Sequence, residues 1–388
     1  MKITPADRIS KVEEYYFSVK LKQIEQMRQE GKDVINLGIG SPDLMPDDEV
    51  IETLQKSAEN PNHHGYQSYV GIPQLREAFS SFYKNSYGVD VNSANEVLPL
   101  IGSKEGIMHI SMAFVNPGDE VLVPNPGYPT YSSVSKLVQA NIVEYDLTEE
   151  NGWLPDLEEL EKRDLSKVKL MWVNYPNMPT GTPSNRQLME ELVAFGKKHS
   201  IIIVNDNPYS FILNPSPSSI LEIEGAKDIV IELNSLSKSH NMAGWRMGMV
   251  ISNPEFINYI LRVKSNMDSG MFKPMQEAAV KALTLESDWF EKVNSEYRAR
   301  REVVFELLDL LNCSYDRNQV GLFAWAKIPS KYERGVELSD IILEKANVFI
   351  TPGFIFGSNG EKYIRISLCA KEDVYRESIN RIKNIENL

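Results

Sequence analysis

Cysteine is almost absent from this chain, which contains only Cys313 and Cys369 among its 388 residues. Two cysteines cannot build a disulfide framework or a cysteine metal site, so we expect both to stay reduced in apolar packing. Histidine is also scarce, and the neighbours His63 and His64 lack the spacing at which a helix presents two metal ligands. The sequence therefore predicts no metal site, and it favours a loop or helix-end position for this histidine pair.

Long apolar runs are missing as well. No segment approaches the roughly 20 apolar residues that span a bilayer, and residues 1–8 (MKITPADR) lack a signal-peptide core. Acidic residues outnumber basic ones by 54 to 41, which gives a formal net charge of −13. A nucleic-acid surface needs clustered basic residues to displace counterions from phosphates. We therefore expect a cytoplasmic protein with neither a membrane nor a nucleic acid as its partner.

No internal repeat or low-complexity segment interrupts the chain, and strands alternate with helices over its middle. Buried strands are expected near 121–123, 169–173, 201–205, 229–234 and 247–251, between amphipathic helices near 130–139, 184–199 and 254–266. This alternation predicts a mainly parallel sheet covered on both faces. The element Gly38-Ile39-Gly40 does not make a dinucleotide loop, because Asp43 stands where the third glycine is needed.

One lysine lies among hydroxyls and small residues in the segment 235–246 (SLSKSHNMAGWR). Lys238 there can form an imine with an aldehyde cofactor, because a partly desolvated lysine loses its proton readily. Arg246, eight positions further on, stays charged and can present two N–H groups to a phosphate. A surface lysine beside a helix-capping serine turn fits the same residues.

Three further candidates lie at predicted strand ends, where open α/β sheets bind their ligands. Asp206 follows the strand at 201–204 and can pair with a protonated pyridine nitrogen, and Tyr209 can hydrogen-bond a ring hydroxyl. Tyr128 follows the strand at 121–123 and can stack on a flat heterocycle. On these fragments alone, a turn cap for Asp206 and a place on the rim of the core for Tyr128 remain open.

A strand at 96–101, a Gly-Ser turn and an apolar helix together make a candidate anion site. The turn contains Gly102, Ser103 and Lys104. Unpaired backbone amides and the helix dipole attract an anion at such a helix start, although simple capping explains the same residues.

In this order and spacing, these pieces resemble the class I and II aminotransferases of the pyridoxal-phosphate fold type I family. The similarity runs from 36–43 (NLGIGSPD) through 65–66 (GY) and 71–76 (GIPQLR) to 363–367 (YIRIS). The resemblance implies an α/β fold whose large domain has a mainly parallel seven-stranded sheet covered by helices. A smaller α+β domain is expected from the N- and C-terminal segments. We place the N-terminal segment at 1–47, the large cofactor-binding domain at 48–285 and the small domain at 286–388.

The resemblance implies pyridoxal 5'-phosphate as the cofactor and gives each candidate a role. Lys238 becomes the Schiff-base lysine, Asp206 the partner of the pyridine nitrogen and Tyr209 the partner of the phenolic oxygen. The other cofactor-binding positions are Gly102, Ser103, Lys104, Ser235 and Arg246 at the phosphate, Ser237 near the lysine, Tyr128 on the ring, and Tyr66 at the phosphate of the neighbouring subunit.

On the substrate side, the resemblance makes Arg365 the clamp for the α-carboxylate, under backbone near Ile39 and Gly40. From composition alone, a solvent-facing position is favoured for Arg365, because its apolar neighbours in 363–368 alternate like those of a half-buried strand, as do residues 321–326.

The stretch 15–17 (YYF) resembles the N-terminal lid of LL-diaminopimelate aminotransferases and makes Tyr15 a substrate-site residue, although one face of an amphipathic helix explains it too. The expected pocket is otherwise largely apolar, with Met178, Met271, Phe272 and Phe354 around it, and it favours neutral amino acids. Lys104, Arg262 or Lys264 can still meet a side-chain acid, so aspartate also remains a candidate donor.

One position departs from the family pattern. Relatives usually carry Asn-Pro-Thr-Gly where this chain has 178–181 (MPTG), and that asparagine bonds the phenolic oxygen. Met178 cannot donate this bond. Either Asn174 or Asn177 substitutes through a shifted turn, or Tyr209 acts alone. With one donor fewer, we expect the internal imine to titrate at a higher pH than usual.

Together these assignments predict a transaminase that moves an amino group between an L-amino acid and a 2-oxoacid. Because Tyr66 serves a partner's site, the resemblance implies a homodimer with shared active sites. Two main alternatives stay open at this point: a carbon-sulfur β-lyase of the same fold, and a non-enzymatic ligand-sensing domain. The second would need a DNA-binding module, and the sequence before residue 36 is short for one. A third, a cofactor-free scaffold, is disfavoured because Lys238 and Asp206 are both present.

Overall fold

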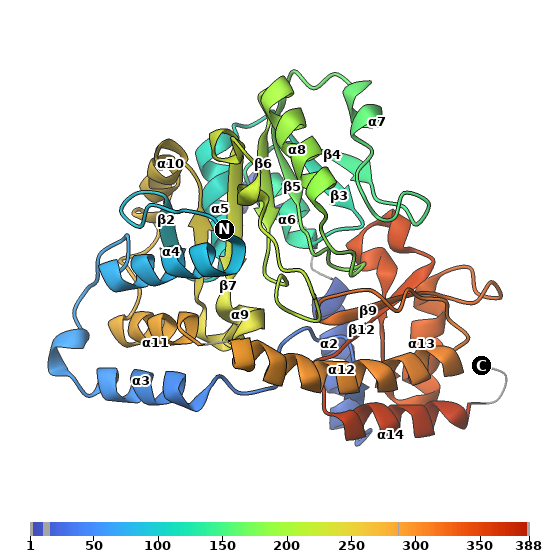
Figure 1. Cartoon of the computed structure of the whole chain (residues 1–388). Helices are drawn as coiled ribbons and strands as arrows, with labels where there is room; N and C mark the ends of the chain where they lie inside the picture. Colours follow the sequence, from blue (N-terminus) through green and yellow to red (C-terminus); the bar gives the residue numbers. More distant parts are fainter. Residues whose placement is uncertain (1–2, 11–15, 286, 386–388) are drawn as a thin grey trace.

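A seven-stranded sheet forms the centre of the computed structural model, which describes residues 3–10, 16–285 and 287–385 (Figure 1). Its strands, in spatial order, are β2 (Val97–Leu100), β8 (Gly248–Ile251), β7 (Val230–Ser235), β6 (Ile202–Asp206), β5 (Val168–Val173), β3 (Glu120–Asn125) and β4 (Asn141–Asp146). Strand β8 runs antiparallel to both of its neighbours, whereas the other neighbouring strands are parallel. The predicted α/β class with a mainly parallel sheet is therefore confirmed.

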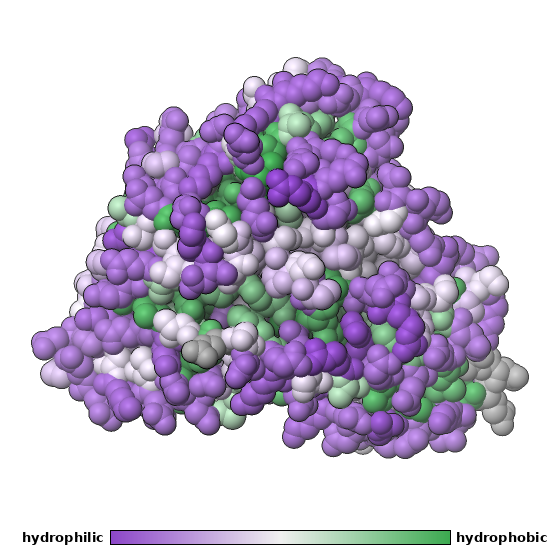
Figure 2. Space-filling model, in the orientation of Figure 1, coloured by the Kyte–Doolittle hydropathy of each residue, from purple (hydrophilic) through white to green (hydrophobic). Residues whose placement is uncertain are grey.

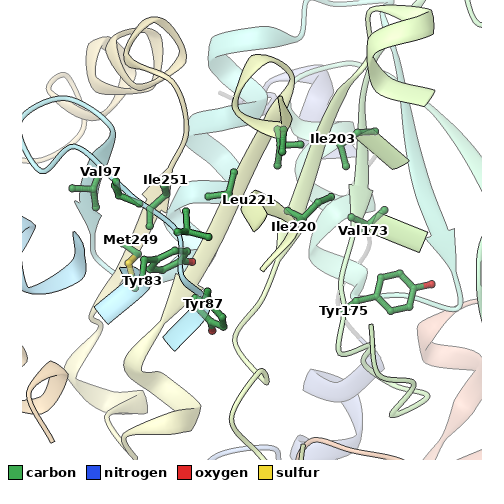
Figure 3. Close-up of a cluster of buried hydrophobic side chains, with 14 of the residues drawn as sticks. Tyr83, Tyr87, Val97, Val173, Tyr175, Ile203, Ile220, Leu221, Met249 and Ile251 are labelled. Carbon is green, nitrogen blue, oxygen red and sulfur yellow. The ribbon is translucent and has the colours of Figure 1, made fainter. Parts of the chain in front are cut away.

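Helices cover both faces of this sheet because successive strand residues point to opposite sides. In β5, Met171 belongs to one apolar cluster and its neighbour Trp172 to another. The first cluster takes residues from α3 (Asp48–Ala58), α4 (Pro73–Tyr87), α8 (Arg186–His199) and α11 (Lys273–Leu283), and the second from α5 (Ser103–Phe114), α6 (Pro129–Leu137) and α10 (Pro254–Lys264). Figure 3 shows part of the first cluster, in which Tyr83 and Tyr87 of α4 lie near Met249 of β8.

Strand β4 is the one sheet strand that the sequence pattern did not indicate. It lies at the sheet edge beyond β3, and only Tyr145 among its six residues is buried. An edge strand lacks the continuous apolar run of a central parallel strand, so its pattern differs little from that of a loop.

A second, smaller sheet has the order β11 (Thr351–Pro352), β12 (Tyr363–Ser367) and β9 (Phe323–Lys327), with antiparallel pairing. It packs with α12 (Ser287–Leu310), α13 (Gly335–Ala346) and α14 (Glu372–Lys383) in a third apolar cluster. Short helices α1 (Asp7–Ser10), α7 (Leu157–Glu161) and α9 (Leu236–Ser239) occur elsewhere in the described chain.

The N-terminal segment joins this second unit. Strand β1 (Ile35–Asn36) pairs in parallel with β10 (Val348–Phe349). Helix α2 (Tyr16–Gln29) buries Ile24 and Met27 against Leu343 of α13 and Phe349 of β10. The exact domain limits at residues 47 and 285 stay a prediction.

The expectation of half-buried strands in the second unit is wrong. Every residue of β12 is buried, and Arg365 is only 5% exposed. Ile364 and Ile366 belong to the third apolar cluster. Arg365, between them, lines a cavity whose other wall is formed by residues of the large unit. The structure therefore excludes a solvent-facing position for the Arg365 side chain.

Hydrophilic residues cover most of the face of the molecule that Figure 2 shows, and hydrophobic residues come to the surface in gaps between them. No helix in the described ranges is long and apolar enough to cross a membrane.

Candidate active site

A cavity of about 500 Å³ lies between the carboxyl edge of the large sheet and the second unit. Its lining contains most of the residues predicted from the sequence: Gly40, Ser103, Lys104, Tyr128, Asp206, Tyr209, Ser235, Ser237, Lys238, Arg246 and Arg365. These residues are separated by up to 325 positions in the chain. The topology brings them together because β3, β6 and β7 end at the same edge, which β12 faces from the other side.

Four predicted residues do not line this cavity. Gly102 lies directly behind the lining, against Arg246. Ile39 is 45% exposed and Tyr66 is 94% exposed, so neither side chain contributes a wall within this chain. Tyr15 falls outside the described residues.

Asp206 lies at the end of β6, and only one of its two carboxylate oxygens accepts a hydrogen bond from a described residue. Its Oδ2 accepts a hydrogen bond from the Tyr131 hydroxyl at 3.0 Å, while its buried Oδ1 has no partner among the described residues. Burial raises the pKa of this carboxyl to about 7. An unpaired buried oxygen at the cavity wall is the acceptor that a protonated pyridine nitrogen requires.

Lys238 lies in α9, directly after β7, and reaches into the same space. Its Nζ donates to the carbonyl oxygen of Gly40. Burial lowers the pKa of this amine below its usual value, and the nearby Arg365 and Arg246 act in the same direction. A larger neutral fraction favours nucleophilic and general-base chemistry, since only the unprotonated amine has a lone pair to offer.

A cradle for an anion lies between β2 and α5, made of Gly102, Ser103 and Arg246. Gly102 has φ +79°, and a Cβ placed on it would overlap the Arg246 guanidinium. Arg246 is oriented by a hydrogen bond from Nη1 to the Ala243 carbonyl at 2.8 Å. Ser103 and Arg246 line the same cavity, so the start of α5 and this guanidinium can act on one phosphate group.

The two asparagines near Met178 already make hydrogen bonds within the protein. Asn174 donates from Nδ2 to the Asp206 carbonyl at 2.5 Å and accepts from the Met178 N–H at 2.8 Å. Asn177 donates to the Asn174 carbonyl at 3.2 Å. Asn174 and Tyr209 both line the cavity. One N–H of Asn174 Nδ2 is used by the Asp206 carbonyl, so the second N–H of Asn174 and the hydroxyl of Tyr209 are both candidate donors to a phenolic oxygen.

Arg365 lies between two aromatic rings on the far wall. Its guanidinium carbon is 3.9 Å from the Phe323 ring centre and 4.5 Å from that of Phe356. Nη2 donates to the Gly38 carbonyl at 3.1 Å, and Nη1 lies 3.2 Å from Met178 Sδ. A planar cation stacked in this way is fixed in orientation and weakly hydrated, which suits it to a carboxylate.

Sequence reasoning missed Tyr131, Phe323 and Phe356. Tyr131 stacks on Trp172 at 4.9 Å and thereby aims its hydroxyl at Asp206. The position of Tyr131 one helical turn after Tyr128 is a weak signal for its role. Nothing in the sequence marks the two phenylalanines, because their role depends on the distant Arg365.

These features fit pyridoxal phosphate. The unpaired Asp206 oxygen matches its ring nitrogen, the glycine cradle beside Arg246 matches its phosphate, and Lys238 lies between them with an amine that deprotonates easily. Each of these residues has a part of the cofactor as its partner, and none of these assignments uses a metal ion.

A methyl group at residue 102 should damage the cradle. Because the Cβ of Gly102→Ala overlaps Arg246, the guanidinium must move, and we expect the affinity for the cofactor to fall at least about tenfold. Titration of the cofactor-free protein followed by absorbance measures this change. Gly118→Ala is the matched control, since Gly118 also has a positive φ, +89°, but has nothing within 4 Å of its added Cβ. Equal losses in both variants would assign the effect to backbone strain instead.

Asp206 should make the stability of the cofactor-free protein depend on pH. An unfolded aspartate titrates near ~3.9, whereas burial raises the pKa of Asp206 to about 7. Unfolding then releases a proton between these values, so the free energy of unfolding falls as pH rises, by at most roughly 1.4 kcal/mol per pH unit. Asp206→Asn should flatten this part of the profile in urea unfolding. An unchanged slope would contradict the assigned pKa.

Comparison with known proteins agrees with this geometry. The sequence model of the family described as aminotransferase class I and II matches residues 32–382. An LL-diaminopimelate aminotransferase of Nitratidesulfovibrio vulgaris is 40% identical and is aligned over 98% of both chains. Transaminase BacF of Bacillus subtilis is 38% identical over 99% of this chain and 97% of its own length.

Solved structures give the same result. The apo structure of BacF superposes with a TM-score of 0.94 at 38% identity, covering 99% of this chain and 98% of that one. An aspartate aminotransferase of Thermus thermophilus with maleate has a TM-score of 0.90 at 25% identity, over 98% and 99% of the two chains. These relatives are aminotransferases by name, so a carbon-sulfur lyase and a ligand-sensing domain are not favoured. The resemblance inferred from the sequence is confirmed: the chain belongs to the class I and II aminotransferase family and is a transaminase.

Proposed function

We propose that this transaminase uses pyridoxal phosphate and acts on L-amino acids with large, neutral side chains. When bound, the cofactor supplies an aldehyde and a ring that takes up electrons from the substrate α-carbon. Lys238 Nζ removes the α-proton and returns it on the cofactor side, because it is the base within reach that burial keeps partly neutral. Asp206 Oδ1 would hold a proton on the ring nitrogen, and Tyr209 would donate to the phenolic oxygen.

Arg365 orients the substrate by pairing with its α-carboxylate. The rings of Phe323 and Phe356 lie against this guanidinium, and Arg365 is only 5% exposed, so little water screens its attraction to a carboxylate. In the same space, the Gly40 carbonyl accepts a hydrogen bond from Lys238 as long as no cofactor is joined to this lysine. Substrate amine and lysine therefore compete within one small, shielded volume.

The side-chain class rests on one observation, the character of the cavity wall. Phe17, Ile355 and Phe356 are apolar lining residues without a proposed role at the cofactor, and Asp206 is the single carboxylate among the described residues of the lining. Because Asp206 already serves the ring nitrogen, a substrate ammonium at the far end of a side chain finds no counter-ion in this set. A large apolar side chain, as in phenylalanine, fits the wall better.

LL-diaminopimelate is the second candidate, because several relatives about 40% identical carry that name. Its remote carboxylate could meet Lys104, which lines the cavity and is exposed. Arg262 and Lys264 do not line the cavity, and Lys264 is buried against Asp268. The remote ammonium would need a carboxylate from elsewhere, for example from a partner subunit.

A homodimer is part of the proposal. Tyr66, Tyr69, Met267 and Phe272 are large hydrophobic side chains with exposed fractions of 94%, 45%, 60% and 45%. Covering such residues with a second copy removes apolar surface from water and takes Tyr66 to the partner's phosphate. Residence in the cytoplasm stays a prediction.

The reaction and its substrate class are tested together. Purified enzyme loaded with pyridoxal phosphate should transfer amino groups to 2-oxoglutarate faster from phenylalanine than from LL-diaminopimelate or aspartate, judged by kcat/KM. Lys238→Ala should lose turnover by several orders of magnitude, whereas the exposed control Lys56→Ala should not. A preference for LL-diaminopimelate would overturn the substrate class alone, and an active Lys238→Ala variant would overturn the mechanism.

Met178 should raise the pKa that the Lys238 nitrogen shows once it is joined to the cofactor. Met178→Asn adds a donor for the phenolic oxygen, which stabilises the form that lacks the proton, so this pKa should fall by about one unit. A spectroscopic pH titration at ~420 nm measures the shift. Met178→Leu adds no donor and should leave the pKa near its original value. Equal shifts in both variants would show that packing, not the missing donor, controls this pKa.

A further inference from the structure

The loop that carries Tyr66 lies between α3 and α4. The segment that follows α10 packs against this loop. Gly270 of that segment has φ +83°, and a Cβ on it would lie 2.5 Å from the carbonyl oxygen of Gln67 and 2.8 Å from that of Ser68. The backbone of residue 270 therefore touches the backbone directly after Tyr66. Any shift of the 268–270 turn must shift this loop.

A buried ion pair fixes the turn. Lys264 ends α10 and is 1% exposed, and its Nζ lies 2.8 Å from both carboxylate oxygens of Asp268. Asp268 Oδ1 also accepts from the Gly270 N–H at 2.8 Å. Burial alone would raise the pKa of Asp268, but Lys264 and this N–H hold it below its usual value. The carboxylate thus joins α10 to the glycine that touches the Tyr66 loop.

A second contact joins the same two segments. Gln276 of α11 is fully buried, donates from Nε2 to the Met271 carbonyl at 2.7 Å and accepts from the Ile72 N–H at 2.8 Å. One side chain thus bonds the end of the supporting segment and the end of the Tyr66 loop. The loop is held on both sides of the exposed tyrosine, although Tyr66 itself is 94% exposed.

The pair also lies near the phosphate cradle of its own subunit. Ligand atoms of Asp268, Glu105 and His109 lie within 4.8 Å of one another, and Glu105 accepts from the Ile101 N–H at 2.6 Å, directly before Gly102. The Lys264 ammonium already occupies both oxygens of Asp268, which argues against a metal ion here. Two routes of influence therefore exist, one to the chain's own cradle and one to the Tyr66 loop.

We propose that the Lys264–Asp268 pair is a positioning element for the neighbouring subunit's cofactor, acting through Gly270 and the Tyr66 loop. The inference rests on the proposed cofactor and dimer. It favours the second route because Asp268 hydrogen-bonds the turn that touches the Tyr66 loop, whereas Glu105 alone connects to its own cradle. Neither Lys264 nor Asp268 lines the cavity, so the pair acts on the site only through other residues.

Hybrid dimers separate the two routes. The first hybrid joins a Lys238→Ala chain to an Asp268→Asn chain, so its one intact lysine receives Tyr66 from a chain with an intact pair. The second joins a wild-type chain to a chain with both substitutions, so its intact lysine receives Tyr66 from the altered loop. Differently tagged chains allow each hybrid to be purified, and a wild-type and Lys238→Ala hybrid is the reference.

Cofactor affinity at the intact lysine, read from the absorbance of the lysine-linked cofactor, should match the reference in the first hybrid. In the second hybrid it should be about tenfold weaker, as expected for a misplaced hydrogen bond to a charged phosphate. In a Tyr66→Phe background, Asp268→Asn should then have little further effect, because both changes remove the same contact. Asp90→Asn, which breaks the exposed Lys84–Asp90 pair, is the matched control and should leave affinity unchanged.

Hydrogen exchange of the cofactor-free dimer gives an independent measurement. Asp268→Asn should speed exchange in residues 65–70, whereas Asp90→Asn should not. If Asp268→Asn does not fold, Gly270→Ala takes its place in both hybrids, since its Cβ displaces the same loop with the ion pair intact.

The outcomes are distinct. Weaker binding in the first hybrid with normal binding in the second assigns the effect to the chain's own cradle and overturns the proposal, as does equal binding in all hybrids. A wild-type protein that is monomeric in light scattering overturns the dimer, and one that never shows lysine-linked absorbance overturns the proposed cofactor.

Discussion

Removal of water from a few charged groups at the sheet edge is the constraint on which the active site depends. Burial pushes the pKa of Asp206 upward and that of Lys238 downward, so each is displaced toward its neutral form before any ligand arrives. This costs stability in the empty protein and is offset when a cationic ring and a phosphate enter. Without a ligand, Asp206 and Lys238 therefore lack the charged partners that their positions in the cavity can accommodate.

The large sheet and its helices were predictable because the central strands contain short apolar runs between amphipathic helices. β6 begins with a run of branched residues, whereas β5 and β7 each mix such residues with a lysine, a glutamate or an asparagine. The edge strand β4 was not predictable, since pairing with a single neighbour leaves its polar residues in solvent. The sequence pattern predicted that β12 is buried on one face only. Its other face is buried by residues of the large unit, which are more than a hundred positions away in the sequence.

Within the site, the predictable residues are those whose chemistry is unusual for their place in the chain. Lys238 in a serine turn and Asp206 at a strand end attract notice without a structure. Phe323 and Phe356 do not, because a phenylalanine that holds a guanidinium has the same local pattern as one that fills a core. Met178 is an intermediate case. The sequence shows that the usual donor is missing, but only the structure shows that Asn174 lines the cavity while Asn177 does not.

The short parallel pairing of β1 with β10 has a mechanical consequence. Residues 35–36 are hydrogen-bonded to residues 348–349 of the second unit, and the Gly40 carbonyl that accepts the hydrogen bond from Lys238 lies only four residues further along. A rigid rotation of the second unit therefore drags this acceptor away from the amine. In the cofactor-free protein, a motion that opens the cleft therefore also frees the Lys238 amine to meet an incoming aldehyde.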